Sequence, residues 1–339
     1  MIVVKLGKVE RNGFSGLVLR AAVIALAAIM FGCSPKPAAQ AEAPQAAAES
    51  AAALTPVKAG YAEVNGIRLY HEVYGSGEPL VLIHGGLMTI PEMSALLQPL
   101  AKDHQVIAVE LQGHGRTADT ERPYKIETMA DDIAALLDQL NAPKADLVGY
   151  SLGGDVALLT AIRHPDKVRR LVAISVAYSR SGWYPEVQEG MSQVGSAMAE
   201  NMMQTPTGKF SKEWPEPKRF AAFLDKMGEE MGEDYDWSAD IPKLSMPVML
   251  VYADNDSISI KHQAEFFALL GGGVKEPGWQ NTQLSRARLA IIPGYSHYNF
   301  MTSTELPPII EKYLADPLTN PPAGAAAASQ AAPEPTKSN

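Results

Sequence analysis

The chain has 339 residues, a formal net charge of −9 and one cysteine. The acidic balance provides no basic surface of the kind that binds nucleic acid, so we expect no nucleic-acid partner. A single cysteine excludes an internal disulfide bond. Residues 34–58 and 317–339 are rich in Ala and Pro, whereas the chain between them is rich in apolar runs and is long enough to form one domain with a large core.

Residues 1–33 have the order of features that is typical of an export signal. Basic side chains come first, the uncharged and mostly apolar run 21–31 follows, and Cys33 ends the segment. The apolar run is too short for a mature membrane-spanning helix. The sequence Met-Phe-Gly-Cys at 30–33 resembles a bacterial lipobox, which implies cleavage before Cys33 and a lipid anchor on it. A plain secretory signal is the alternative.

Several acyl chains on one residue would anchor the protein durably in a membrane. Ser34, directly after the cysteine, resembles the residue found in proteins retained at the outer membrane. We therefore expect a lipid-anchored protein of the bacterial cell envelope, at the outer membrane and on its periplasmic side.

Two segments have few large apolar side chains, namely 34–58 and 317–339. Such segments cannot bury enough surface to offset the entropy that is lost on ordering. We predict a flexible tether at 34–58, a single folded domain at 59–316 and a disordered tail at 317–339.

The predicted domain begins with a hairpin and continues with buried strands. Asn65-Gly66 lies between two alternating segments within 61–74, which is a strong hairpin signal. Apolar runs then recur at Leu80–Ile83, Val106–Val109, Ala145–Val148, Leu171–Ile174, Val248–Val251 and Leu289–Ile292. Runs of this kind suit parallel strands that are covered on both faces. Helical spacing in 129–140 and 152–162 lies between runs, so we predict an α/β fold with a mostly parallel sheet of about eight strands.

More than seventy residues separate Ile174 from Val248 without a convincing buried strand. An ordered excursion of this length between core strands is usually functional. It contains aromatic and adaptable apolar side chains, namely Trp183, Trp214 and Trp237 and the methionines at 191, 198, 202, 203, 227 and 231. We predict a mostly helical cap over about 178–243. For any single one of these side chains, the alternative is that it only holds the cap together.

Ser151 lies in the sequence Gly-Tyr-Ser-Leu-Gly-Gly at 149–154, directly after an apolar run and before a helical one. This context predicts a serine on a sharp strand-to-helix turn. A serine hydroxyl is a poor nucleophile unless it is held exposed beside a base and near backbone N–H donors. The turn is therefore a candidate nucleophile site.

His297 is the best candidate for the base, because it lies in a loop just beyond the last apolar run. Open α/β sheets present catalytic groups at that end of their strands. The other histidines considered have positions typical of structural or solvated side chains, namely His71, His104, His114, His164 and His262. A carboxylate is needed to orient the imidazole, and both Asp254 and Asp256 follow the Val248–Val251 run.

Residues 61–314 resemble an α/β-hydrolase with a cap, of the haloperoxidase and C–C-hydrolase-like group. The chain order Ser, Asp, His is the order of that family. Three motifs carry the resemblance: His-Gly-Gly at 84–86, Gly-His-Gly-Arg-Thr at 113–117 and the serine motif at 149–154.

The resemblance implies a catalytic triad of Ser151, Asp256 and His297, with Asp254 as the alternative acid. It also implies an oxyanion hole formed by the backbone N–H groups of Gly86 and Leu152.

Three further polar residues lie in or beside the family motifs. His84 orients its loop in relatives, and a direct catalytic role is the alternative. Glu110 and Gln112 stand where relatives often have Asp and Arg, and we expect both of them to be structural.

A serine nucleophile argues against the epoxide hydrolases and dehalogenases of this fold, because those enzymes use aspartate there. No metal-ligand or phosphate-binding motif is present in the sequence, so we expect neither a metal nor a cofactor. The leading hypothesis is a serine hydrolase that cleaves a carboxylic ester or lactone with an apolar part, through an acyl-Ser151 intermediate. The alternatives are a cofactor-free C–C bond hydrolase and an envelope protein that binds a ligand without turnover.

Replacement of the predicted anchor residue tests the localisation. We expect Cys33→Ala to move the protein from the membrane fraction to the soluble fraction, because the lipid attachment point is lost. Fractionation followed by immunoblotting measures this, and Ser34→Ala serves as the control that keeps the anchor. Retention of Cys33→Ala in the membrane fraction would contradict the lipid anchor.

Overall fold

The computed structural model describes residues 54–204 and 219–319. The predicted signal with Cys33, most of the predicted tether, Trp214 and nearly all of the predicted tail lie outside these ranges, so their assignments stay predictions. Within the described ranges, no helix combines the length and apolar character needed to cross a membrane.

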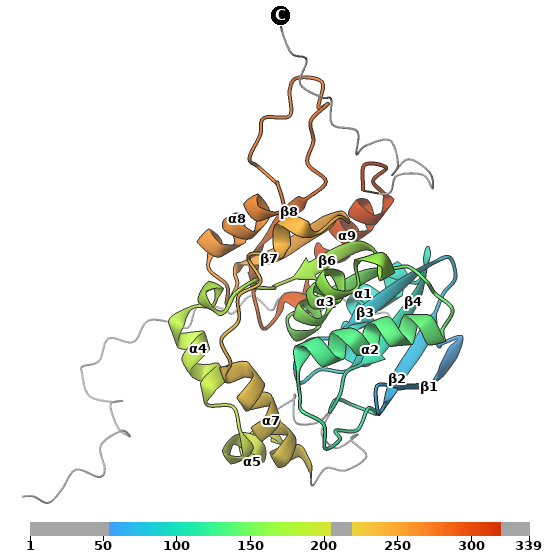
Figure 1. Ribbon diagram of the computed structural model, residues 1–339, viewed down its shortest axis with the longest axis vertical. Helices are drawn as coiled ribbons and strands as arrows, with labels where there is room; N and C mark the ends of the chain where they lie inside the picture. Colours follow the sequence, from blue (N-terminus) through green and yellow to red (C-terminus); the bar gives the residue numbers. More distant parts are fainter. Residues whose placement is uncertain (1–53, 205–218, 320–339) are drawn as a thin grey trace, which may run out of the picture. The chain divides into compact units, whose positions relative to one another are not determined.

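One sheet of eight strands runs through the described part of the chain, in the order β1-β2-β4-β3-β5-β6-β7-β8 (Figure 1). The strands are β1 Lys58–Val64, β2 Ile67–Tyr74, β3 Glu78–Ile83, β4 His104–Glu110, β5 Ala145–Tyr150, β6 Val168–Ile174, β7 Val248–Asn255 and β8 Arg288–Ser296. The pairs β1–β2 and β2–β4 are antiparallel, and the remaining pairs are parallel. The predicted α/β fold with a mostly parallel sheet of about eight strands is confirmed.

The turn between β1 and β2 is the predicted hairpin. Val64 pairs with Ile67, so Asn65 and Gly66 alone form the connection. Both have positive φ, 44° and 85°, as a tight two-residue hairpin turn requires. Asn and Gly adopt this conformation more readily than other residues, which is why the dipeptide predicts the turn.

Helices cover both faces of the sheet, and this explains the apolar strands (Figure 1). Alternate residues of one strand enter opposite cores: Val81 and Ile83 pack on one side, Leu80 and Leu82 on the other. The first core includes residues of α2 Ile126–Gln139, α3 Leu152–Arg163 and α8 Ile260–Leu269, and the second includes residues of α1 Ser94–Leu100 and α9 Leu306–Ala315.

The chain between β6 and β7 contains three α-helices in its described part, α4 Pro185–Ser192, α5 Ala199–Met202 and α7 Phe220–Gly232. They are drawn together at one end of the domain in Figure 1, and α7 contacts both α4 and α5. Two of the tryptophans in this excursion, Trp183 and Trp237, are buried.

Helix α7 also rests on the core domain. The Phe223 ring packs edge-on against the rings of His114 and Tyr124, with centroid distances of 5.2 and 5.4 Å. The Lys226 ammonium forms an ion pair with Asp119 at 2.9 Å. The excursion is therefore held over the loops that follow β4.

Candidate active site

Ser151 is the first residue after β5 and the N-cap of α3. Its φ of 51° lies in the region that non-glycine residues rarely adopt. Its amide donates a hydrogen bond to the carbonyl of Ile174, the last residue of the neighbouring β6, at 2.9 Å. The strained backbone is thus fixed by the sheet itself.

Glycines make this turn possible, because each stands where a side chain has no room. A Cβ on Gly149 would lie 2.1 Å from the Gly153 carbonyl oxygen, and one on Gly153 would lie 2.3 Å from the His84 carbonyl oxygen. A Cβ on Gly154 would lie 2.3 Å from a methyl group of Val176. The backbones of β5, α3 and the end of β3 can therefore approach closely only with glycine at these positions.

The structure brings the predicted nucleophile, base and acid together. Ser151 Oγ lies 3.0 Å from His297 Nε2, and His297 Nδ1 lies 2.9 Å from Asp256 Oδ1. His297 and Asp256 are both buried. With Nδ1–H donating to the carboxylate, Nε2 is free to accept the serine proton, which is the arrangement that general-base activation of a serine needs.

The two candidate acids have different surroundings. Asp254 is exposed, and its Oδ1 accepts hydrogen bonds from the Asn255 side chain and from the amide of Gly294 at 2.8 Å. Within the described residues, no hydrogen bond joins Asp254 to His297, whereas Asp256 contacts the imidazole directly. The structure therefore places Asp256, and not the alternative Asp254, beside the base.

Ser175, which belongs to none of the sequence motifs, joins this group in the structure. Its Oγ donates a hydrogen bond to Asp256 Oδ2 at 2.6 Å, and the Ala253 amide approaches the same oxygen at 3.3 Å. The available signal was its position: Ser175 directly follows β6, as Ser151 directly follows β5.

Aromatic side chains surround the His297 imidazole. The rings of Trp183 and Tyr298 lie at centroid distances of 5.4 and 5.6 Å, the first buried and the second exposed. The Tyr150 hydroxyl donates a hydrogen bond to the His297 carbonyl oxygen. Burial raises the pKa of Tyr150, so this hydroxyl stays protonated as a donor and the loop that carries His297 is held.

The two residues predicted to form an oxyanion hole are neighbours. A Cβ on Gly86 would lie 3.8 Å from a methyl group of Leu152, the residue after the serine, and 2.8 Å from the terminal methyl group of Met227. Leu152 is the first residue of α3, where backbone N–H groups lack helical partners and the helix dipole favours negative charge. Met227 of α7, in the segment between β6 and β7, therefore covers Gly86.

Two buried histidines order the loops around Gly86. His84 Nδ1 donates to the Gly85 carbonyl oxygen at 2.7 Å, and its Nε2 accepts from the Leu111 amide at 3.1 Å. His114 Nε2 accepts from the Leu87 amide at 3.0 Å. Burial lowers the pKa of His84, and burial together with the neighbouring His84 lowers the pKa of His114 to about 3. Both rings are thus neutral acceptors. In the described part of the chain, the hydrogen bonds of His84 link two loops and do not reach Ser151, Asp256 or His297.

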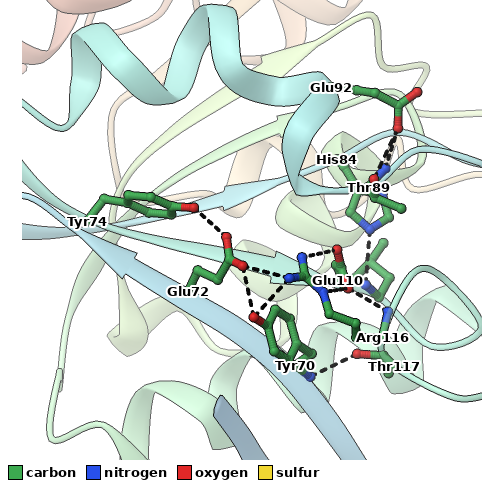
Figure 2. Close-up of polar contacts among 10 residues, drawn as sticks. Tyr70, Glu72, Tyr74, His84, Thr89, Glu92, Glu110, Arg116 and Thr117 are labelled. Carbon is green, nitrogen blue, oxygen red and sulfur yellow. Dashed lines mark hydrogen bonds and ion pairs between the residues drawn. The ribbon is translucent and has the colours of Figure 1, made fainter. Parts of the chain in front are cut away.

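An ionic network around the buried Glu110 orders the loop that follows β4, and Figure 2 shows its contacts. Glu110 accepts hydrogen bonds from the Arg116 amide, from Arg116 Nε at 3.0 Å and from Nη2 at 2.6 Å. Arg116 Nη1 lies 2.8 Å from Glu72 Oε1, and the guanidinium stacks 3.8 Å above the Tyr70 ring. A buried carboxylate needs such partners, so Glu110 has the structural role expected from the sequence.

Gln112 also has structural contacts. Its Nε2 donates to Asp119 at 2.8 Å, and its Oε1 accepts from Arg122 Nε at 2.6 Å. Asp119 in turn binds Lys226 of α7, so Gln112 belongs to the contacts that hold the excursion. Among the described residues, no group of three or more His, Cys, Asp or Glu side chains is arranged to hold a metal ion.

The sheet order, the serine turn after β5 and the loops after β7 and β8 define the α/β-hydrolase fold. A family model described as "alpha/beta hydrolase fold" matches residues 78–206. E-2-(acetamidomethylene)succinate hydrolase has a similar structure, with a TM-score of 0.59 and 21% sequence identity, covering 76% of this chain and 99% of that chain. The chain therefore has the α/β-hydrolase fold.

Sequence relatives include two kinds of hydrolase. The chain is 41% identical over 118 residues to a 2-hydroxymuconate semialdehyde hydrolase from Pseudomonas sp. (strain CF600), covering 33% of this chain and 41% of that protein. It is 28% identical over 244 residues to a pimeloyl-[acyl-carrier protein] methyl ester esterase from Neisseria meningitidis serogroup A, covering 66% of this chain and 72% of that protein. The first match spans less than half the length of that relative.

Replacement of Gly153 tests the close packing at the turn. We expect Gly153→Ala to lower the thermal midpoint by roughly 5–10 °C, because overpacking a buried contact costs about 1–3 kcal/mol. Gly232→Ala is the control, since a Cβ there meets nothing within 4 Å. Thermal unfolding followed by circular dichroism measures both variants. Equal midpoints for the two would contradict the requirement for glycine at 153.

Proposed function

We propose that the protein is a serine hydrolase that cleaves a carboxylic ester or lactone through an acyl-Ser151 intermediate. One observation carries the proposal, namely a continuous chain of hydrogen bonds. Ser151 Oγ lies 3.0 Å from His297 Nε2, and His297 Nδ1 lies 2.9 Å from Asp256 Oδ1. The relationship to a methyl ester esterase over 66% of this chain supports the ester as substrate class.

The proposed acyl transfer uses these residues in turn. Ser151 Oγ attacks the carbonyl carbon while His297 Nε2 takes the serine proton, and the Asp256 carboxylate stabilises the imidazolium. The oxyanion is stabilised by the backbone N–H groups of Gly86 and Leu152. The tetrahedral intermediate collapses as His297 gives its proton to the leaving alcohol. Water, activated by the same imidazole, then attacks the acyl-serine and releases the acid.

Apolar side chains next to the proposed active site favour a substrate with an apolar part. The Met227 methyl group lies at Gly86, and the buried Trp183 ring lies beside His297. Both side chains come from the chain between β6 and β7. Methionine adapts to differently shaped apolar groups, so a small or medium apolar acyl or alcohol group suits this surface.

A second candidate function is the cofactor-free hydrolysis of a C–C bond in a β-diketone-type substrate. The 41% identity to the 2-hydroxymuconate semialdehyde hydrolase favours it over the 118 residues that match. The same serine, histidine and aspartate would serve that reaction. A binding protein without turnover has no need of this hydrogen-bonded arrangement, so we place that alternative last.

We also propose that this hydrolase acts in the bacterial cell envelope, anchored by lipid on Cys33. The support is the sequence alone, namely the signal-like segment 1–33 and its lipobox-like end. The Ala- and Pro-rich segment that follows would give the enzyme reach from the membrane surface.

Labelling with a fluorophosphonate probe tests the nucleophile. We expect one probe per wild-type molecule and none on Ser151→Ala, because only a serine activated by a base reacts quickly with the phosphorus centre. Ser303→Ala is the control, a buried serine outside that chain of hydrogen bonds. Intact-mass measurement counts the probes. Absence of labelling in the wild type would contradict the catalytic proposal.

Substrate comparison separates the two candidate reactions. We expect turnover of short- to medium-chain p-nitrophenyl esters and little turnover of a dienoic diketone acid. The kcat/KM values for an acyl-length series and for the diketone acid, measured on the same preparation, give the comparison. If every ester is inert while the diketone acid is hydrolysed, the C–C bond hydrolase replaces the esterase as the function.

A further inference from the structure

Four neighbouring strands end at the proposed active site, and the first residue after each is polar. They are Ser151 after β5, Ser175 after β6, Asp256 after β7 and His297 after β8. Hydrogen bonds join them, from Ser151 to His297, from His297 to Asp256 and from Ser175 to Asp256. Three of the four have a role in the proposed reaction, and Ser175 has none.

We propose that Ser175 is a positioning residue, which holds the Asp256 carboxylate in the orientation that His297 needs. This role rests on the proposed function. The two carboxylate oxygens have separate partners: Oδ1 faces His297 Nδ1 at 2.9 Å, and Oδ2 accepts from Ser175 Oγ at 2.6 Å. Among the described residues, the one further donor to Oδ2 is the Ala253 amide, at 3.3 Å.

Burial makes this hydrogen bond important. Asp256 is 6% exposed and Ser175 is fully buried. A buried carboxylate needs hydrogen bonds in place of water, and a hydroxyl–carboxylate bond of 2.6 Å has the short length of a charge-assisted one. Without the hydroxyl, Oδ2 keeps the longer amide contact, and the carboxylate is freer to rotate away from the imidazole.

The backbone of Ser175 also indicates that its side chain is needed. Its φ is 56°, a conformation that glycine adopts without cost and serine does not. The Ser175 amide donates to the Val251 carbonyl oxygen of β7 at 2.8 Å, which fixes the residue beside the strand that carries Asp256. Glycine would satisfy the backbone at this position, so the hydroxyl is what serine adds.

Two variants that lack the hydroxyl separate positioning from a structural role. Ser175→Ala keeps the strained backbone, whereas Ser175→Gly relieves it. If Ser175 positions Asp256, both variants lower kcat for a p-nitrophenyl ester about 10- to 100-fold and leave KM within about threefold, because a hydrogen bond to a charged group is lost and no substrate contact changes. Both also alter the low-field proton resonance of the bond from His297 to Asp256.

The control is Ser303→Ala, which removes another buried serine hydroxyl that contacts a carboxylate, Glu305 at 3.0 Å. We expect it to keep the wild-type kcat. A wild-type kcat in Ser175→Gly would overturn the positioning role. Fluorophosphonate labelling of the wild type distinguishes failure of the positioning role from failure of the proposed function. If the wild type is labelled and active and Ser175→Gly has the wild-type kcat, only the positioning role is refuted. If the wild type is not labelled, the proposed function is refuted, and the positioning role with it.

Discussion

The chain can turn sharply from β5 into α3 only because positions 149, 153 and 154 carry no side chain. A Cβ at any of these three positions would lie only 2.1 to 2.3 Å from a carbonyl oxygen or a methyl group. This close approach brings the end of β3, and with it the loop of Gly86, next to the first turn of α3. The relation of the serine to the predicted oxyanion donors depends on that contact.

The sheet places the other groups. Because β5, β6, β7 and β8 are consecutive and parallel, the residues that follow them meet at one edge. The Asp256 carboxylate at this edge is buried and is held on both oxygens. The neutral rings of His84 and His114 and the paired Glu110 order the loops nearby, so several buried titratable groups in this region act by positioning the backbone.

The sequence predicts the sheet well because strands that are buried on both faces must be apolar. Asn65-Gly66 predicts the hairpin turn because Asn and Gly adopt the required positive φ more easily than other residues. Ser151 and His297 follow from their places after apolar runs. The choice between Asp254 and Asp256 does not follow, because both occupy one loop and only the folded chain shows which carboxylate reaches the imidazole. Ser175 belongs to no motif, and its importance comes from the spatial order of the strands.

The proposed mechanism requires the hydrogen-bonded serine to form a covalent intermediate with an ester substrate. Rapid mixing with a p-nitrophenyl ester, acid quenching and peptide mass spectrometry detect such an intermediate. We predict a transient mass increase of one acyl group on the peptide that contains Ser151, absent in His297→Ala because the base is lost. Ester hydrolysis without any acyl group on that peptide would rule out the acyl-serine intermediate.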